Sequence, residues 1–411
     1  MSTTSVESPS TLTRSSAQLL PLLLANFTMT AGSYAFIAVT GPLARLMHLQ
    51  AWHIGVIIAA VGVVWIATAR RWGRAADRFG RVPILRLSIV GFTVSYLCLV
   101  GYIGWALRGG AQHVPALGLN IAALLILRAA MGGSFAGLPV GATAWIADHT
   151  AGPSRAAVMA RFGAAGAVGM VFAPPLAGWI GRYDLAIALL VFALLPLAGL
   201  PGLGRLRDAW AKQARQMPPR LKVGDERIRM QWLSALALYS AIMIANSALG
   251  FYVIDRLHVA AQQAAAVVGY ALGSAGLGLI LMQALVGRLP RVAPLQWLRW
   301  GALVSACGFA SVLLVDPQQP VAVCASYLVA AFGMGAAFPA IAALASNAVG
   351  PAEQGACAGA MSTAQGFSMV IAPLVGTVLY DVQPTVPFAL IGVLLLSVFV
   401  ASWRRTGPAA E

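Results

Sequence analysis

Twelve long apolar runs limit what this 411-residue chain can fold into. Each is close to or above the ~20 residues that a helix needs to cross the hydrocarbon core of a bilayer. The predicted spans are residues 18–44, 52–70, 83–107, 117–147, 156–181, 184–203, 230–254, 263–286, 294–315, 320–347, 357–380 and 386–403. Only 9% of the residues are charged, whereas a soluble domain carries about 25%. The sequence therefore predicts an all-α integral membrane protein with twelve transmembrane helices.

One long polar segment divides these spans into two sets of six. It predicts an N-terminal half (residues 1–203), a cytoplasmic linker (residues 204–229) and a C-terminal half (residues 230–411). The halves also repeat in sequence. A shift of 214 residues aligns Gly73-Arg74 with Gly287-Arg288, and a shift near 198 aligns Ala173-Pro174 with Ala372-Pro373. Such internal repeats are typical of transporters built from two pseudo-symmetric halves.

The positive charge is distributed unevenly between the two sides of the predicted membrane. When the loops are assigned alternately, 22 of the 27 Lys and Arg residues fall on one side and 4 on the other, with Arg128 inside a span. Cytoplasmic loops carry such an excess, so we expect both termini to be cytoplasmic. The net charge of +15 is thus an orientation signal with some attraction to anionic lipid, and does not predict nucleic-acid binding. The first apolar run is interpreted as a retained span, since no small-residue cleavage site follows it.

A short charged segment between the second and third spans carries the clearest motif. Its residues Gly73, Asp77, Arg78, Gly80 and Arg81 match, in order and spacing, the loop signature of the major facilitator superfamily, which this chain resembles. The glycines permit a tight turn, and we predict a short hairpin loop over residues 72–83. The resemblance implies the major facilitator fold, and secondary active transport by alternating access in the inner (plasma) membrane of a bacterium.

Arg128 lies well inside the fourth span, where an arginine costs about 2.5–3.5 kcal/mol on insertion scales. The segment Leu125–Gly133 is similar to the fourth-span signature of the superfamily, which implies a role in proton coupling or substrate binding. The alternative is an arginine that bonds backbone carbonyls or extends toward the outer surface. Both interpretations remain open at this stage.

The fifth span carries a subclass signal. Gly163, Gly166 and Gly169 leave one face thin enough for close helix packing. The pattern of Gly169, Pro174 and Gly178 resembles the antiporter signature of 12-span drug:proton exporters, and implies a thin, bent helix at the seam between the halves. Ordinary close packing is the alternative.

The resemblance also implies a cytoplasmic charge network of Asp77, Arg81 and Asp148 that locks an outward-open state. Asp77 could in addition lie at the positive N-terminus of the eleventh span, a position that carboxylates favour. A solvated group of loop charges is the alternative interpretation.

Polar residues at helical spacing mark three candidate faces of a central pathway. They are Asn26, Thr30, Ser33 and Tyr34 in the first span, Tyr239, Met243, Asn246 and Gly250 in the seventh, and Ser362, Gln365 and Met369 in the eleventh. Together with Arg128 they suggest substrate-binding positions, since uncharged polar groups in a bilayer need water or a partner. Hydrogen bonds between packed helices would explain them equally well.

All twelve carboxylates fall in loops or at span ends. Proton coupling would therefore run through Asp77, Asp255 or a histidine, or it would not occur at all. A core without carboxylates favours neutral or anionic substrates, such as a siderophore or an amphiphilic antibiotic. The predicted function is proton-coupled efflux of such a small organic molecule. A facilitator-type importer or uniporter and a non-transporting receptor or scaffold are the alternatives.

No pattern predicts an enzyme, a metal site or a cofactor. The four cysteines lack metal-ligand spacing, the five histidines lack i,i+4 pairing, and there is no phosphate-binding loop. The expected partners are a small-molecule substrate, protons and membrane lipid, with the protein as a monomer and no nucleic acid bound.

Overall fold

The computed structural model describes residues 9–109, 114–150, 152–206, 208, 225–289, 291–350 and 353–403. These residues form helices and their connections, with no strand among them. The α-helices are α1 (Pro9–Leu46), α2 (Ala51–Phe79), α3 (Arg81–Leu107), α4 (Leu117–Phe135), α5 (Gly137–His149), α6 (Gly152–Gly181), α7 (Leu185–Leu194), α8 (Leu200–Leu203), α9 (Arg229–Asp255), α10 (Ala261–Arg288), α11 (Pro294–Ser311), α12 (Val323–Asn347), α13 (Gln354–Val382) and α14 (Val386–Trp403). Short 3₁₀ turns are η2 (Leu195–Gly199), η3 (Val312–Leu314) and η4 (Pro320–Ala322).

The prediction of twelve spans is confirmed, because twelve helical segments in the described residues are long and apolar enough to cross a membrane. Two of them are interrupted. The fourth consists of α4 and α5, which meet at Ala136, and the sixth passes from α7 through η2 to α8. Pro196 lies at the start of η2 and lacks a backbone N–H, which explains the local break of the α-helical pattern.

The charged segment after the second span differs from the predicted hairpin loop. Helix α2 continues to Phe79, and α3 begins at Arg81, so Gly80 alone separates the two helices. The predicted span ended at residue 70 because the arginines that follow are too polar for the bilayer core. Polar residues are compatible with a helix that leaves the membrane, however, so hydropathy marks the span and not the end of the helix.

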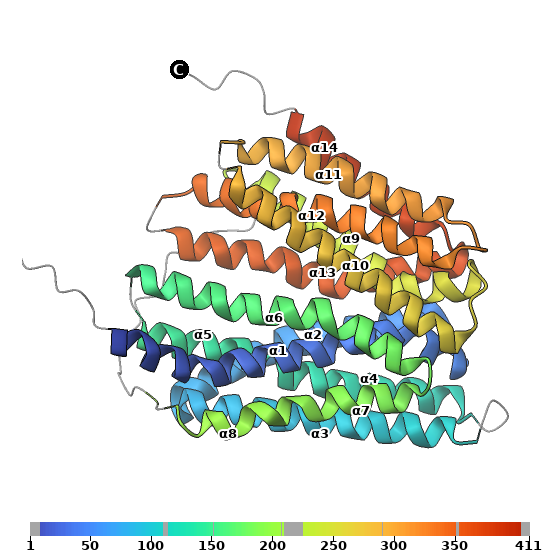
Figure 1. The fold of residues 1–411 in the computed structure, drawn as a ribbon, viewed down its shortest axis with the longest axis horizontal. Coiled ribbons are helices and arrows are strands. Elements are labelled where there is room, and N and C mark those ends of the chain that lie inside the picture. The colour runs from blue at the N-terminus through green and yellow to red at the C-terminus, as the bar shows by residue number, and fades with distance from the viewer. Residues whose placement is uncertain are drawn as a thin grey trace, which may run out of the picture.

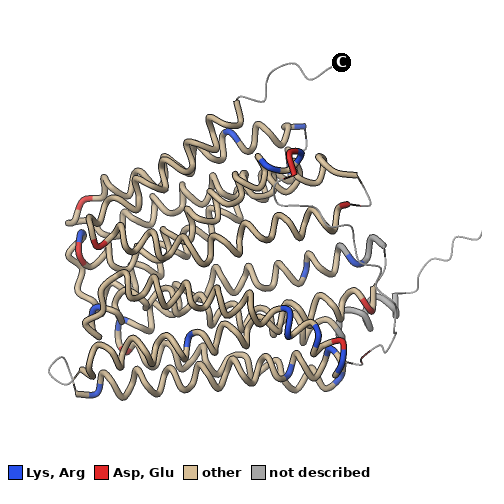
Figure 2. The backbone as a smooth tube through the Cα atoms, turned by 180° about the vertical axis from the view of Figure 1, so that it is seen from behind, with Lys and Arg blue, Asp and Glu red and all other residues tan. Residues whose placement is uncertain are grey.

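The helices form two groups that run along the same direction, with α1–α8 in one half and α9–α14 in the other (Figure 1). We call the end that contains the α2–α3 turn (residues 79–81) the basic end. The opposite end, which contains the α1–α2 turn (residues 47–50), is the far end. Charged residues gather at these two ends, and the middle of the bundle is almost free of them (Figure 2). Helix α8 ends at Leu203 and α9 begins at Arg229, and most of the predicted linker between them lies outside the described residues.

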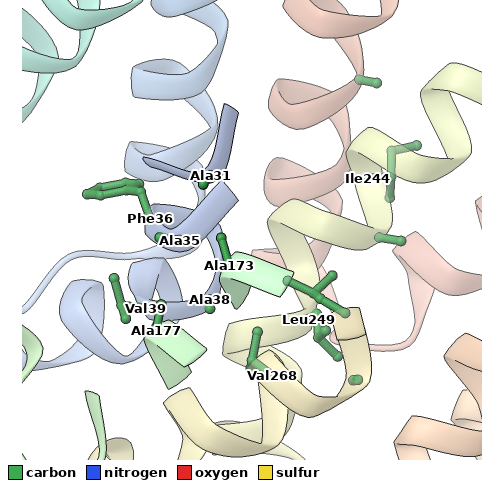
Figure 3. Close-up of a cluster of buried hydrophobic side chains, with 14 of the residues drawn as sticks. Ala31, Ala35, Phe36, Ala38, Val39, Ala173, Ala177, Ile244, Leu249 and Val268 are labelled. Atoms are coloured by element: carbon green, nitrogen blue, oxygen red, sulfur yellow. The ribbon is translucent and has the colours of Figure 1, made fainter. Parts of the chain in front are cut away.

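Small residues bring the two halves together. Figure 3 shows alanines of α1 and α6, among them Ala35 and Ala173, grouped near Leu249 of α9 and Val268 of α10. Nearer the far end, an added methyl group at Gly41 of α1 would lie 2.5 Å from the Cα of Gly250 in α9, so the two backbones are almost in contact there. Glycine and alanine allow this approach because they carry little or no side chain.

The halves approach each other at the far end and separate toward the basic end. On α2, a methyl at Gly55 would overlap Thr377 of α13, while at Gly73, near the basic end, it would meet only Val140 of its own half. Glycines in the basic-end parts of α6, α10 and α13 have no neighbouring atom within 4 Å of such a methyl; these are Gly163, Gly287, Gly355 and Gly359. The close backbone contacts between the halves therefore lie toward the far end, and these basic-end glycines make none.

Candidate functional site

The turn between α2 and α3 is fixed by a glycine and by a carboxylate from the linker. Gly80 has φ 97° and ψ 162°, a conformation that favours glycine. The carboxylate of Asp208 accepts hydrogen bonds from the backbone N–H groups of Arg81 (2.9 Å) and Val82 (3.0 Å). A methyl group at Gly80 would lie 2.5 Å from Oδ2 of Asp208. Gly80 thus serves both the backbone angle and the approach of Asp208, which caps α3 from outside the helix.

The predicted network of Asp77, Arg81 and Asp148 is brought together at this turn. Arg81 donates from Nη1 to Asp77, one helical turn before it, and from Nε to Oδ2 of Asp148 at 3.1 Å. Asp148 lies at the end of α5, so the network links α2, α3 and α5 of one half. Asp77, whose predicted second position was the N-terminus of the eleventh span, pairs here with Arg81 instead.

A cavity of about 470 Å³ opens beside this network. Its lining comes from four helices of the first half, namely Gly73, Ala76, Asp77, Arg81, Val140, Thr143, Ala144, Ala147, Arg155 and Met159. Arg78 is the remaining charged member of the predicted motif, and its guanidinium carbon lies 5.2 Å from the ring centre of Phe79. Arg78 is exposed, and it forms no ion pair with the described carboxylates.

Arg128 is buried inside the first half, with 9% of its surface exposed. Its guanidinium carbon lies 4.1 Å from the ring centre of Phe36 in α1, and Nη1 donates to the sulfur of Met131 at 3.3 Å. Its Nε atom has no hydrogen-bond acceptor, and no described carboxylate pairs with it. Phe36 points away from the seam between the halves (Figure 3). Arg128 is therefore a cation held under an aromatic ring, neither bonded to backbone carbonyls nor extended to the surface.

Helix α6 lies at the seam, as the fifth-span pattern predicted. A methyl at Gly169 would overlap the carbonyl oxygen of Phe27 in α1, and one at Gly178 would overlap the backbone of Ala265 in α10. The backbone of Pro174 is the closest neighbour of Gly269 in α10. The helix continues through both of its prolines. One side of α6 thus contacts its own half and another contacts the second half.

The predicted polar faces fall into two groups. Asn26 is buried and donates to the carbonyl oxygen of Phe162 at 2.6 Å, so its amide joins α1 to α6. Thr30 donates to Asn26 at 3.5 Å. Tyr34 of the first half and Tyr239 of the second are both partly buried.

The other predicted positions are more open. Asn246, Ser33, Met243 and Met369 are half-buried, whereas Gln365 and Ser362 of α13 are exposed and Gly250 is buried at the α1–α9 contact.

Sequence reasoning missed a second charge cluster, at the far end. Arg45 of α1 binds Asp255 of α9, and Tyr380 of α13 donates to the same carboxylate at 2.9 Å. Asp381 accepts from the first backbone N–H groups of α2. The sequence predicts Asp255 as a candidate for proton coupling and does not predict this ion pair. The pairing partners lie 210 residues apart, and the one available signal was a lone arginine and a lone aspartate at far-end span boundaries.

The described end of the linker forms a third cluster. Arg227 binds Asp225 and also Glu353, which lies in the turn before α13. The hydrogen bonds from Arg227 hold the pKa values of the Asp225 and Glu353 carboxyl groups below their usual range. No group of three or more His, Cys, Asp or Glu side chains in the described residues could hold a metal ion.

Twelve apolar helices in two six-helix halves, joined at one end and separated at the other, define an integral membrane protein of the transporter class. The sequence profile of the Major Facilitator Superfamily matches residues 22–366 and 231–411. The chain therefore belongs to this superfamily, and it is a transporter and not an enzyme.

Relatives and solved structures agree with this assignment. The chain is 26% identical to the tetracycline resistance protein, class C, of Escherichia coli over 83% of each chain. It is 25% identical to multidrug resistance protein 1 of Bacillus subtilis (strain 168), over 90% of this chain and 91% of the relative.

Among solved structures, a bacterial homolog of the human lysosomal transporter Spinster, inward-facing and occupied, has a TM-score of 0.68 at 17% identity, covering 94% of this chain and 91% of that one. A bacterial homologue of the iron transporter ferroportin, also inward-facing, has a TM-score of 0.68 at 13% identity, covering 94% and 99%. At these identities the likeness concerns the fold.

Proposed function

We propose that this protein exports a small neutral or anionic organic molecule by alternating access, in exchange for protons. The observation that carries the proposal is the position of α6. Its antiporter-like residues Gly169, Pro174 and Gly178 form close backbone contacts at the seam, on α1 on one side and on α10 on the other. A rocking motion of the halves must pass through these contacts. The relatives named as tetracycline and multidrug resistance proteins support export.

In this proposal the basic end faces the cytoplasm of a bacterium, because the Lys and Arg excess lies there (Figure 2). The structure then corresponds to the inward-open state, with both termini cytoplasmic. A substrate would enter between the halves from the cytoplasm. The self-contained Asp77–Arg81–Asp148 network, with Arg78 beside it, would become part of the cytoplasmic closure when the halves come together at that end.

The proposed substrate class follows from charge. Arg128 is a buried guanidinium without a carboxylate partner, and the described carboxylates lie at the ends of the helices. An organic cation would find no counter-charge in the middle of the bundle, whereas an anionic group would compensate Arg128. Because Phe36 covers Arg128, we expect this contact to need a movement of that ring. Polar positions proposed to line the pathway are Asn26, Thr30, Tyr34, Tyr239, Asn246 and Gln365.

Uptake into inverted membrane vesicles tests this function. Anionic, neutral and cationic fluorescent solutes are compared with and without a pH gradient that is acidic inside. We expect the gradient to drive accumulation of anionic or neutral solutes, and Arg128→Ala and Asp77→Asn to abolish it while the protein still inserts. Arg182→Ala is the matched control, since Arg182 is an exposed arginine that stacks on Trp179 and Tyr183 at the far end.

Three results would contradict the proposal. A transport rate that does not change with the pH gradient would favour a facilitator-type mechanism. Preferential accumulation of organic cations would overturn the substrate class. Wild-type rates in both Arg128→Ala and Asp77→Asn would remove the roles assigned to these residues.

A further inference from the structure

An ion pair at the far end joins the two halves. Arg45, near the end of α1, donates from Nε to Oδ1 of Asp255 at 3.2 Å, and from Nη2 to Oδ2 of the same carboxylate. Asp255 is the last residue of α9, so the pair connects the first half to the second. The side chains are 30% and 28% exposed, which leaves the pair partly shielded from solvent. The other ion pairs among described residues lie within the first half, or within the linker and between the linker and the second half.

Two aromatic neighbours hold this pair in place. The hydroxyl of Tyr380 donates to Oδ2 of Asp255 at 2.9 Å, and the ring centre of Phe251 lies 5.0 Å from the guanidinium carbon of Arg45. Tyr380 and Phe251 both belong to the second half. The carboxylate thus keeps one of its partners when the halves separate, and is already oriented for Arg45 when they meet again.

Asp381 makes a second polar contact between the halves. Its oxygens accept from the backbone N–H groups of Ala51 at 3.3 Å and of Trp52 at 2.8 Å, the first residues of α2. A helix N-terminus carries a partial positive charge that favours a carboxylate. In both contacts the first half supplies the donors and the second half supplies the carboxylate. Opening the far end would therefore separate two second-half carboxylates from their positive partners.

We infer that Arg45, Asp255 and Asp381 form a clasp that keeps the far end closed and sets the equilibrium between the two open states. This inference rests on the alternating access of the proposed function, but not on the substrate, the direction of transport or the coupling ion. The three residues are positioning residues, because they act on the relative placement of the halves. At the basic end, Arg81 has its partners within the first half, and Arg227 joins the linker to the second half, so neither pairs the first half with the second. The clasp is consequently the ionic contact that the transition has to break.

Distances between spin labels measure this equilibrium directly. The labels are placed at Tyr183 and Gln318, exposed turn positions of opposite halves at the far end, after replacement of the four free cysteines Cys98, Cys307, Cys324 and Cys357. We expect Arg45→Ala and Asp255→Ala each to raise the ratio of far-end-open to far-end-closed molecules about tenfold, because each leaves one partly buried charge without its partner. Exchanging the charges, Arg45→Asp with Asp255→Arg, should restore most of the closed population.

Arg227→Ala is the matched control, since it removes an arginine whose two carboxylate partners lie in the linker and in the second half, and none in the first half. We expect no change in the far-end distance. Asp381→Ala should shift the equilibrium, and Asp381→Asn should shift it less, because an amide oxygen can still accept from Ala51 and Trp52. If Arg45→Ala does not fold, Arg45→Lys gives the same comparison with a smaller shift, since it keeps the charge and loses the two-pronged geometry.

Unchanged distances in the Arg45 and Asp255 variants, or an equal shift in Arg227→Ala, would overturn the clasp. The measurement uses neither substrate nor a pH gradient. A negative result in the export assay therefore does not contradict the clasp. Unchanged spin-label distances in the clasp variants likewise do not contradict the export proposal.

Discussion

The two ends of the bundle use charge in opposite ways. At the basic end, Arg81 pairs with Asp77 and Asp148 inside the first half, and Arg227 at the end of the linker pairs with Asp225 beside it and with Glu353 of the second half. At the far end, Arg45 pairs with Asp255 across the halves. The halves can thus be apart at the basic end with every one of these charges compensated. Separation at the far end leaves a charge unpaired, so in this chain the closed end is the one with ionic contacts between the halves.

Preventing closure of the far end is the strongest test of this difference between the two ends. Gly41→Leu would place a side chain into the backbone of Gly250, because even a methyl group there comes within 2.5 Å. We expect transport to fall about a hundredfold or more, since the far-end-closed state becomes a rare one. Spin-label distances at the far end should lengthen in the same variant.

Gly392→Leu in α14 provides the control, because no atom lies within 4 Å of a methyl group at that position. Its transport and its distances should match the wild type. Normal transport in Gly41→Leu would show that the halves do not need to meet at this contact.

An intermediate effect is expected at the basic end, where a cap supports the Arg81 network. Asp208→Ala removes the acceptor for two N–H groups at the start of α3, at a cost of about 1 kcal/mol in stability. Asp208→Asn, a good cap, should lose less. Thermal unfolding in detergent measures the stability, and vesicle uptake measures the effect on transport.

Asp184→Ala is the corresponding change at the far end, since Asp184 caps α7 by accepting from Ala186 and Ile187. It should cost similar stability and leave transport unchanged. Equal loss of transport in both variants would mean that Asp208 acts on stability alone and does not position the network.

The smallest effect concerns pH at the linker. Arg227 lowers the pKa values of Asp225 and Glu353, so their ionised forms are favoured in the folded protein. The stabilisation by this contact is complete above the ordinary carboxyl pKa, and is lost as the pH falls through the lowered pKa values. A spin label at Glu226, an exposed neighbour, should show constant mobility from neutral pH to about pH 5 and greater mobility in stronger acid. Arg227→Ala should show the mobile signal throughout, and a transition near neutral pH would contradict the assignment.

Hydropathy was sufficient for the membrane spans, because apolar length alone decides whether a helix can cross a bilayer. It does not show where a helix ends outside the membrane. The predicted loop therefore begins too early, since α2 continues to Phe79. The Asp77–Arg81–Asp148 network was predictable from the resemblance, since its members lie in a recognisable local motif. The positions of these residues match the expectation, while their roles in transport remain predictions.

The contacts that sequence reasoning did not find are those between distant residues. Arg45 and Asp255 are separated by 210 positions, and no local pattern relates them. Asp208 lies in the predicted linker, for which the sequence indicates no contact with the helices. Its capping of α3 depends on how the chain returns to the turn at Gly80. The cover of Arg128 by Phe36 likewise depends on how the fold places α1 relative to α4. Tertiary geometry decides all three.

The alanine-rich seam between α1, α6, α9 and α10 has a consequence for speed. Alanine has no χ1 rotamers to choose between, so surfaces made of Ala31, Ala35, Ala38, Ala173 and Ala177 lose no side-chain entropy when they come together (Figure 3). The first half therefore needs no rotamer change at these positions when the halves move, whereas Leu249 and Val268 of the second half keep side chains that can change rotamer. Larger residues at these positions would pack more firmly, but each conformational change would then require rotamer changes. A seam of this composition therefore favours rapid turnover over a rigid resting state.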